Sequence, residues 1–130
     1  MTSPSSSPPD LRQKRILVVE DELMIRMLLE DMLAELGCTI AAEATHIKDA
    51  LEAVRNAAFD VAILDVNLGG EPISPVADAL AARGTPFVFA TGYGERALPE
   101  SHRERPTLKK PFQLEHLKHT LETALGMTHL

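Results

Sequence analysis

Residues 16–22 read ILVVEDE, an aliphatic run that ends in three consecutive carboxylates. A continuous aliphatic run is typical of a strand that is buried on both faces of a parallel sheet, and we place this strand at residues 15–20. Carboxylates this close repel one another, and none of them belongs in the interior without a partner. The stretch therefore predicts a central strand with a charged site at its carboxyl end.

The rest of the chain alternates strands and helices. Further strands are predicted, from aliphatic or β-branched runs, at residues 39–44, 60–65, 85–90 and 107–109. Apolar residues at helical spacing predict helices at residues 22–36, 46–58, 74–82 and 112–125. Two glycines and two prolines in residues 92–106 leave room for only a short or irregular fourth helix. The pattern predicts an α/β fold with a doubly wound five-stranded parallel sheet.

Length and composition indicate one globular domain. The chain has 130 residues, of which 45% are apolar and 25% charged. We assign residues 14–126 to this domain, with a disordered tail rich in serine and proline at residues 1–13 and a short tail at residues 127–130. We expect no output domain after it, so the protein should act through other proteins.

Charge and cysteine usage narrow the class of protein. The net charge of −6 and the lack of a DNA-binding motif give no indication of a nucleic-acid partner. No apolar run approaches the roughly 20 residues that a membrane span needs. Cys38 is the one cysteine, which fits a reducing compartment. We therefore expect a cytoplasmic protein that contacts neither nucleic acid nor membrane.

Polar residues gather at the predicted carboxyl ends of the strands, where doubly wound sheets bind ligands. Glu20 and Asp21 end the first strand, Asp65 the third, Thr91 the fourth and Lys110 the fifth. Crowded carboxylates are tolerable if a hard cation such as Mg²⁺ neutralises them. Lysine and threonine suit phosphoryl oxygens, and a carboxylate with a free oxygen can act as a nucleophile and become an aspartyl phosphate.

Four segments make the pattern specific: ILVVEDE, VAILDVNLGG, FVFATGYG and LKKPF, in this order. Together they resemble a response-regulator receiver domain of two-component signalling, over about residues 14–126. The resemblance implies a flavodoxin-like fold. Residues 89–94, FATGYG, further resemble the single-domain FAT GUY subgroup of alphaproteobacteria, which is often tied to general stress signalling.

The resemblance implies a metal-assisted phosphoacceptor. Asp65 would accept the phosphoryl group. Asp21 would bind Mg²⁺ directly, Glu20 would act through water, and Asn67 would offer its backbone carbonyl. We assign the third acid, Glu22, to the first turn of the following helix, where the macrodipole favours negative charge.

Two further residues match receiver positions, and two features depart from the pattern. Thr91 would follow the phosphoryl group with its hydroxyl, and Lys110 would pair with a phosphoryl oxygen. We choose Lys110 over Lys109 because neighbours in a strand point to opposite sides. The usual aromatic switch residue is replaced by Thr107, and the segment before it is short. We hypothesise that residues 92–105 reorder on phosphorylation, with Tyr93 covering the site.

The function implied by the resemblance is acceptance of a phosphoryl group from a sensor histidine kinase or a histidine phosphotransfer protein. Signalling would then proceed through a downstream protein or a phosphorelay, without turnover of a separate metabolite. One alternative is a degenerate receiver that binds partners without phosphorylation, which Thr107 and the short segment favour. Another is a magnesium-dependent phosphatase with an aspartyl-phosphate intermediate, which would need an acid where the chain has Asn67.

Overall fold

A five-stranded parallel sheet forms the centre of the molecule. The computed structural model describes residues 11–92 and 98–127. The strands are β1 (Arg15–Val19), β2 (Thr39–Ala44), β3 (Val61–Asp65), β6 (Phe87–Thr91) and β7 (Thr107–Lys109). They lie in the order β2-β1-β3-β6-β7. The chain first adds β2 on one side of β1, and it then adds β3, β6 and β7 in turn on the other side. The predicted doubly wound α/β fold is confirmed.

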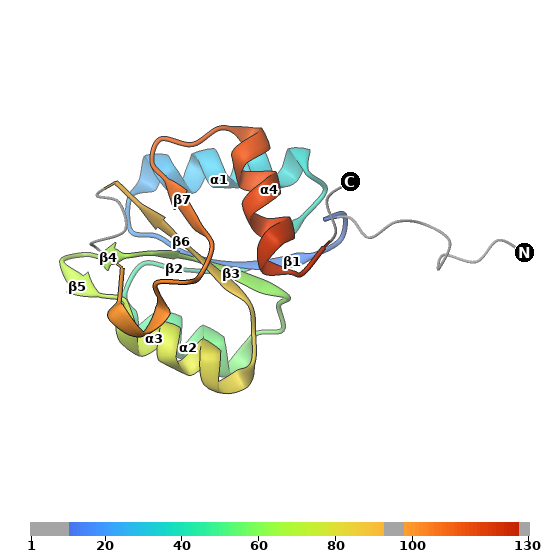
Figure 1. The fold of residues 1–130 in the computed structure, drawn as a ribbon. Helices are drawn as coiled ribbons and strands as arrows, with labels where there is room; N and C mark the ends of the chain where they lie inside the picture. The colour runs from blue at the N-terminus through green and yellow to red at the C-terminus, as the bar shows by residue number, and fades with distance from the viewer. Residues whose placement is uncertain (1–10, 93–97, 128–130) are drawn as a thin grey trace, which may run out of the picture.

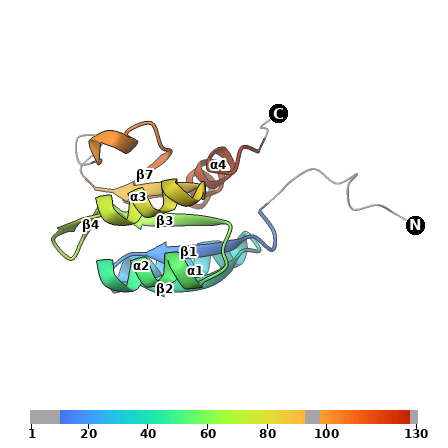
Figure 2. The ribbon, with the colours of Figure 1, turned by 90° about the horizontal axis from the view of Figure 1, so that it is seen from below.

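Helices cover both faces of this sheet (Figures 1 and 2). One face carries α1 (Leu23–Glu35) and α4 (Leu114–Ala124), and the other carries α2 (Ile47–Asn56) and α3 (Ser74–Arg83). In the described part of the chain, none of these helices has the length and apolar character needed to cross a membrane.

The aliphatic run of β1 is buried because its side chains alternate between the two faces. Ile16 and Val18 pack in the cluster that contains Leu33 of α1. Leu17 and Val19 pack in the opposite cluster, which contains Leu80 of α3. Each of the four β1 side chains is at most 1% exposed. A strand with helices on both sides has no polar face, which explains the unbroken aliphatic pattern.

The segment between β6 and β7 contains a 3₁₀ helix at Glu100–His102 in its described part, and no α-helix there. His102 is buried, and its Nε2 lies 2.7 Å from Oδ1 of Asp78 in α3. Its ring meets the edge of Phe87 with 5.6 Å between ring centroids. The guanidinium of Arg105 lies 4.2 Å from the centre of the same Phe87 ring. The short fourth helix that we predicted is therefore anchored to α3 and β6.

A small hairpin follows β3. It joins β4 (Asn67–Leu68) and β5 (Glu71–Pro72), which pair in antiparallel fashion. Gly69 and Gly70 connect them with positive φ angles of 58° and 86°, a conformation that glycine adopts without strain. The hairpin extends from the carboxyl end of β3, next to the predicted site (Figure 1).

The domain extends slightly beyond the boundaries that we predicted. Leu11 is buried in the apolar cluster between the sheet and helices α1 and α4. The N–H of Gln13 donates to the carbonyl of Gly37 at 2.8 Å. Met127 packs against the same cluster. Residues 11–13 therefore belong to the packed domain, because Leu11 supplies an apolar side chain to the core. The other parts of the two predicted tails, residues 1–10 and 128–130, lie outside the described residues.

Candidate functional site

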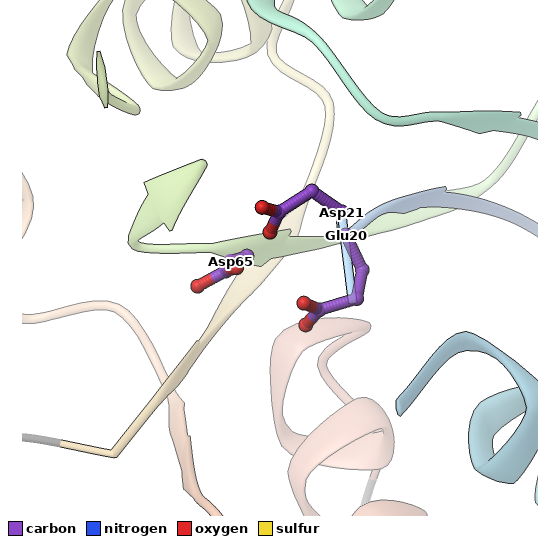
Figure 3. A group of neighbouring side chains, drawn as sticks. All are labelled: Glu20, Asp21 and Asp65. Atoms are coloured by element: carbon purple, nitrogen blue, oxygen red, sulfur yellow. The ribbon is translucent and has the colours of Figure 1, made fainter. Parts of the chain in front are cut away.

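Three carboxyl groups meet at the carboxyl ends of two neighbouring strands (Figure 3). Glu20 and Asp21 follow β1, and Asp65 is the last residue of β3. Each side chain offers an oxygen, and these oxygens lie within 4.8 Å of one another. Glu20 and Asp65 are buried, with 1% and 6% of their surface exposed. The carboxylates converge because β1 and β3 are paired in parallel up to Val19 and Leu64.

Lys110 supplies a positive charge to this group. Its Nζ lies 3.0 Å from Oε1 of Glu20, 3.3 Å from Oε1 of Glu22 and 3.5 Å from Oδ1 of Asp65. The backbone N–H of Lys110 donates to the carbonyl of Thr91 at 2.8 Å, which fixes its position beside the end of β6. The peptide bond between Lys110 and Pro111 is cis. Its neighbour Lys109 is exposed.

The residues around Asp65 form a cleft of about 400 Å³, called the acidic cleft below. Its walls include Asp21, Glu22, Asp65, Asn67, Thr91 and Lys110. Thr91 is buried at the end of β6, and the backbone N–H of Asn67 donates to Oδ1 of Asp65 at 3.2 Å. Acidic residues, one lysine and one threonine thus line the same space.

The two residues proposed as a switch or cover, Tyr93 and Thr107, do not contribute to the described site. Tyr93, proposed as a cover, lies outside the described residues. Thr107 does not line the acidic cleft, and its hydroxyl instead donates to the carbonyl of Arg105 at 3.1 Å. At the position of the usual aromatic switch residue, the Thr107 side chain therefore bonds to the backbone two residues before it.

The environment of Asp65 opposes ionisation of its carboxyl group. Burial and the negative charge of Glu20 raise the pKa of Asp65 to about 7, against the opposing effects of Lys110 and the Asn67 N–H. Burial lowers the pKa of Lys110, but its contacts with Glu20 and Asp65 outweigh that effect, and the pKa is raised overall. Lys110 is thus charged at neutral pH, while Asp65 is held close to its titration point.

The residues present fit a hard divalent cation. Oε1 of Glu20 is buried and receives no well-aligned hydrogen bond, although it lies within ion-pair distance of Lys110. Oxygen ligands from Glu20, Asp21 and Asp65 converge within reach of one ion, and carboxylate oxygens are what Mg²⁺ prefers. A bound cation would relieve the repulsion that raises the pKa of Asp65.

Two residues of this site, Glu22 and Arg26, have contacts that the sequence alone does not reveal. Glu22 was assigned to the first helical turn, but it is the N-cap residue of α1, makes no capping hydrogen bond and pairs with Lys110 instead. Arg26 donates from Nη1 to the backbone carbonyls of Glu20 and Asp21 at 3.2 and 3.4 Å. A basic residue near a helix start runs against the macrodipole, and this signal could have identified Arg26.

The hairpin also contributes to the site. The backbone N–H of Gly69 donates to Oδ2 of Asp21 at 3.1 Å. A Cβ at this position would lie 3.8 Å from the same oxygen, and its φ is positive. The hairpin therefore brings a backbone donor to one of the candidate metal ligands, which the sequence alone did not reveal.

A doubly wound domain with this acidic cleft has the fold and the functional groups of a two-component receiver. Known proteins agree: the family model of the response regulator receiver domain matches residues 16–122. The chain therefore belongs to the response regulator receiver domain family, whose members generally accept a phosphoryl group.

Individual relatives support this assignment. The transcriptional regulatory protein PdtaR of Mycobacterium tuberculosis is 32% identical, in an alignment that covers 97% of this chain and 63% of that protein. The chain thus spans less than two thirds of that relative.

Solved structures are also similar. SdrG from Sphingomonas melonis Fr1 has 46% sequence identity and a TM-score of 0.79, covering 88% of this chain and 98% of that chain. The receiver domain of the PhyR response regulator from Erythrobacter litoralis has 33% identity and a TM-score of 0.74, with 92% and 95% coverage.

Proposed function

We propose that this protein accepts a phosphoryl group on Asp65 from a histidine kinase or a histidine phosphotransfer protein, with Mg²⁺ in the acidic cleft. One observation carries the proposal: Asp65 shares a single cleft with Asp21, Thr91 and Lys110, beside the buried carboxylate of Glu20. Membership of the receiver family supports the same chemistry.

The residues of the cleft have distinct roles in this transfer. An oxygen of Asp65 forms a bond to phosphorus while the bond from phosphorus to the donor's imidazole nitrogen breaks, and the electron pair leaves with the imidazole. Lys110 pairs with a phosphoryl oxygen, and the Thr91 hydroxyl donates to another. Mg²⁺, when bound by Asp21, Asp65 and the Asn67 carbonyl, with Glu20 acting through water, supplies charge neutralisation for the transferring group.

An exposed apolar patch offers a docking surface for the donor protein. Leu23, Met24 and Met27 lie at the start of α1 and are 60%, 81% and 53% exposed. Glu22, which precedes them directly, lines the acidic cleft. Exposed apolar side chains in a group are typical of protein interfaces. A donor that presents its histidine to Asp65 would cover this patch.

Output is proposed to pass through another protein, from the segment that precedes β7. Leu98 is buried in the core and His102 is held by Asp78, so residues 98–105 start from an anchored conformation. The proposed reordering of residues 92–105 therefore requires these contacts to change. The covering role of Tyr93 and the FAT GUY assignment stay predictions, since residues 93–97 are not described.

Intact-protein mass spectrometry tests the proposed function. The chain is incubated with acetyl phosphate and Mg²⁺, and we expect an acid-labile adduct with the mass of one phosphoryl group. Asp65→Asn should abolish the adduct, whereas Asp60→Asn, just before the same strand, should retain it. No adduct from acetyl phosphate or from a competent phosphotransfer protein would refute the proposal and favour a phosphorylation-independent binding module.

A further inference from the structure

Glu22 is the one member of the three-carboxylate run whose role the proposed function does not explain. Its side chain is 62% exposed, yet its Oε1 lies 3.3 Å from Nζ of Lys110. Glu22 occupies the N-cap position of α1, where a side chain ordinarily bonds to the first backbone N–H groups. It makes no such bond. The carboxylate is therefore directed toward Lys110 rather than toward its own helix.

Lys110 is shared among three carboxylates that differ in burial. Glu20 and Asp65 side chains are 1% and 8% exposed, and Glu22 is mostly in solvent. Phosphorylation adds negative charge to Asp65, so Lys110 must then pair with the phosphoryl oxygens. Breaking the contact with buried Glu20 is costly because a buried charge would lose its partner. Glu22 can return to water at little cost.

We propose that Glu22 is a positioning residue, which holds Lys110 at the mouth of the acidic cleft in the resting state and competes with the phosphoryl group for it. The contact between Glu22 and Lys110 is the one that breaks when Asp65 is phosphorylated. Glu22 therefore lowers the affinity of the resting protein for phosphoryl-like anions. This inference rests on the proposed function, since it concerns the lysine that binds the phosphoryl group.

Two substitutions distinguish the effect of the contact between Glu22 and Lys110 from the effect of the negative charge of Glu22 alone. Glu22→Gln removes the negative charge. Glu22→Asp keeps the charge but is one methylene shorter, and aspartate is a favoured N-cap residue that would turn toward the helix. Glu35→Gln is the matched control, because Glu35 is exposed at the far end of α1, roughly 18 Å along the helix.

The measurements are titrations followed in ¹H–¹⁵N correlation spectra of the full chain. Beryllium fluoride at saturating Mg²⁺ stands in for the phosphoryl group, and Mg²⁺ alone reports on the metal site. We expect Glu22→Gln and Glu22→Asp to bind beryllium fluoride about two- to fivefold more tightly than the wild type, the range typical of an exposed ion pair. Glu22→Gln should also bind Mg²⁺ more weakly by a similar factor. Glu22→Asp and Glu35→Gln should bind Mg²⁺ as the wild type does.

The other outcomes are decisive as well. If Glu22→Asp binds beryllium fluoride like the wild type while Glu22→Gln binds it more tightly, charge alone acts and the contact with Lys110 has no role. Weaker or unchanged binding by both variants overturns the competition. If the wild type takes up no beryllium fluoride, or Asp65→Asn takes it up equally well, the proposed function itself fails and this inference fails with it.

Discussion

Replacing Asp65 by asparagine is expected to stabilise the metal-free protein, although it removes the proposed phosphoacceptor. Asp65 is buried beside Glu20, and its pKa is raised from the ordinary 3.8 to about 7. Between pH 3.8 and about pH 7, the folded protein therefore retains a proton on Asp65 that the unfolded chain has already lost. Its free energy of unfolding must fall as pH rises through that window, and the loss is complete above about pH 7. Asparagine is not ionised and escapes this loss.

The size of the effect follows from the same pKa. A rise from 3.8 to about 7, at about 1.4 kcal/mol for each pKa unit, sets a ceiling of roughly 4 kcal/mol. Water in the open cleft screens the carboxylates, and the lost ion pair with Lys110 offsets part of the gain. We therefore expect Asp65→Asn to gain about 1–2 kcal/mol above pH 7.

Urea unfolding followed by circular dichroism measures this gain in EDTA, between about pH 5 and pH 8. The difference between Asp65→Asn and the wild type should shrink as pH falls toward the ordinary pKa of aspartate. Adding Mg²⁺ should stabilise the wild type and leave the variant unchanged, because a ligand that binds only the folded state stabilises it. A variant that is no more stable than the wild type at pH 8 would refute the reasoning.

The matched control has the opposite sign. Asp60 lies just before β3, and its Oδ2 accepts from the backbone N–H of Arg15 at 2.7 Å. This bond is the main cause of the lowered pKa of Asp60, so its contribution is present above the ordinary pKa and is lost as pH falls through the lowered value. Asp60→Asn should therefore destabilise the protein at neutral pH, by about 1 kcal/mol.

Three further predictions concern other parts of the molecule. Burial raises the pKa of the Cys38 thiol from 9.0 to about 11. The thiol of the folded protein should therefore react with a disulfide reagent near pH 8 about 100-fold more slowly than the thiol of the urea-unfolded chain. Rates that agree within a few-fold would contradict this. His102→Ala should cost about 2–3 kcal/mol in urea unfolding, and Asp78→Asn much less, because an amide oxygen can still accept. Met24→Glu should slow transfer from a phosphotransfer protein that phosphorylates the wild type by about tenfold. Adduct formation with acetyl phosphate should be unchanged, and an equal loss with both donors would exclude a docking role.

Much of the fold could be predicted because the helices bury β1 and β3 on both faces. That burial demands an unbroken aliphatic pattern, which is visible in residues 16–19 and 61–64. The hairpin at residues 67–72 could not be predicted with the same certainty, since two-residue strands carry no periodic signal. The packing of Leu11 was likewise hidden, because the proline-rich residues before it dominated the local composition.

The sequence by itself determined which residue types end each strand, and parallel pairing then placed Glu20, Asp21, Asp65, Thr91 and Lys110 at one edge of the sheet. Only the tertiary structure decided how one lysine is shared among its carboxylates. Glu22 contacts a residue 88 positions away, and no local pattern encodes such a contact. The physical reason is that backbone periodicity fixes the direction of a side chain, whereas the partner of a charge depends on which elements fold beside it. The third acid of ILVVEDE thus faces Lys110 rather than its own helix.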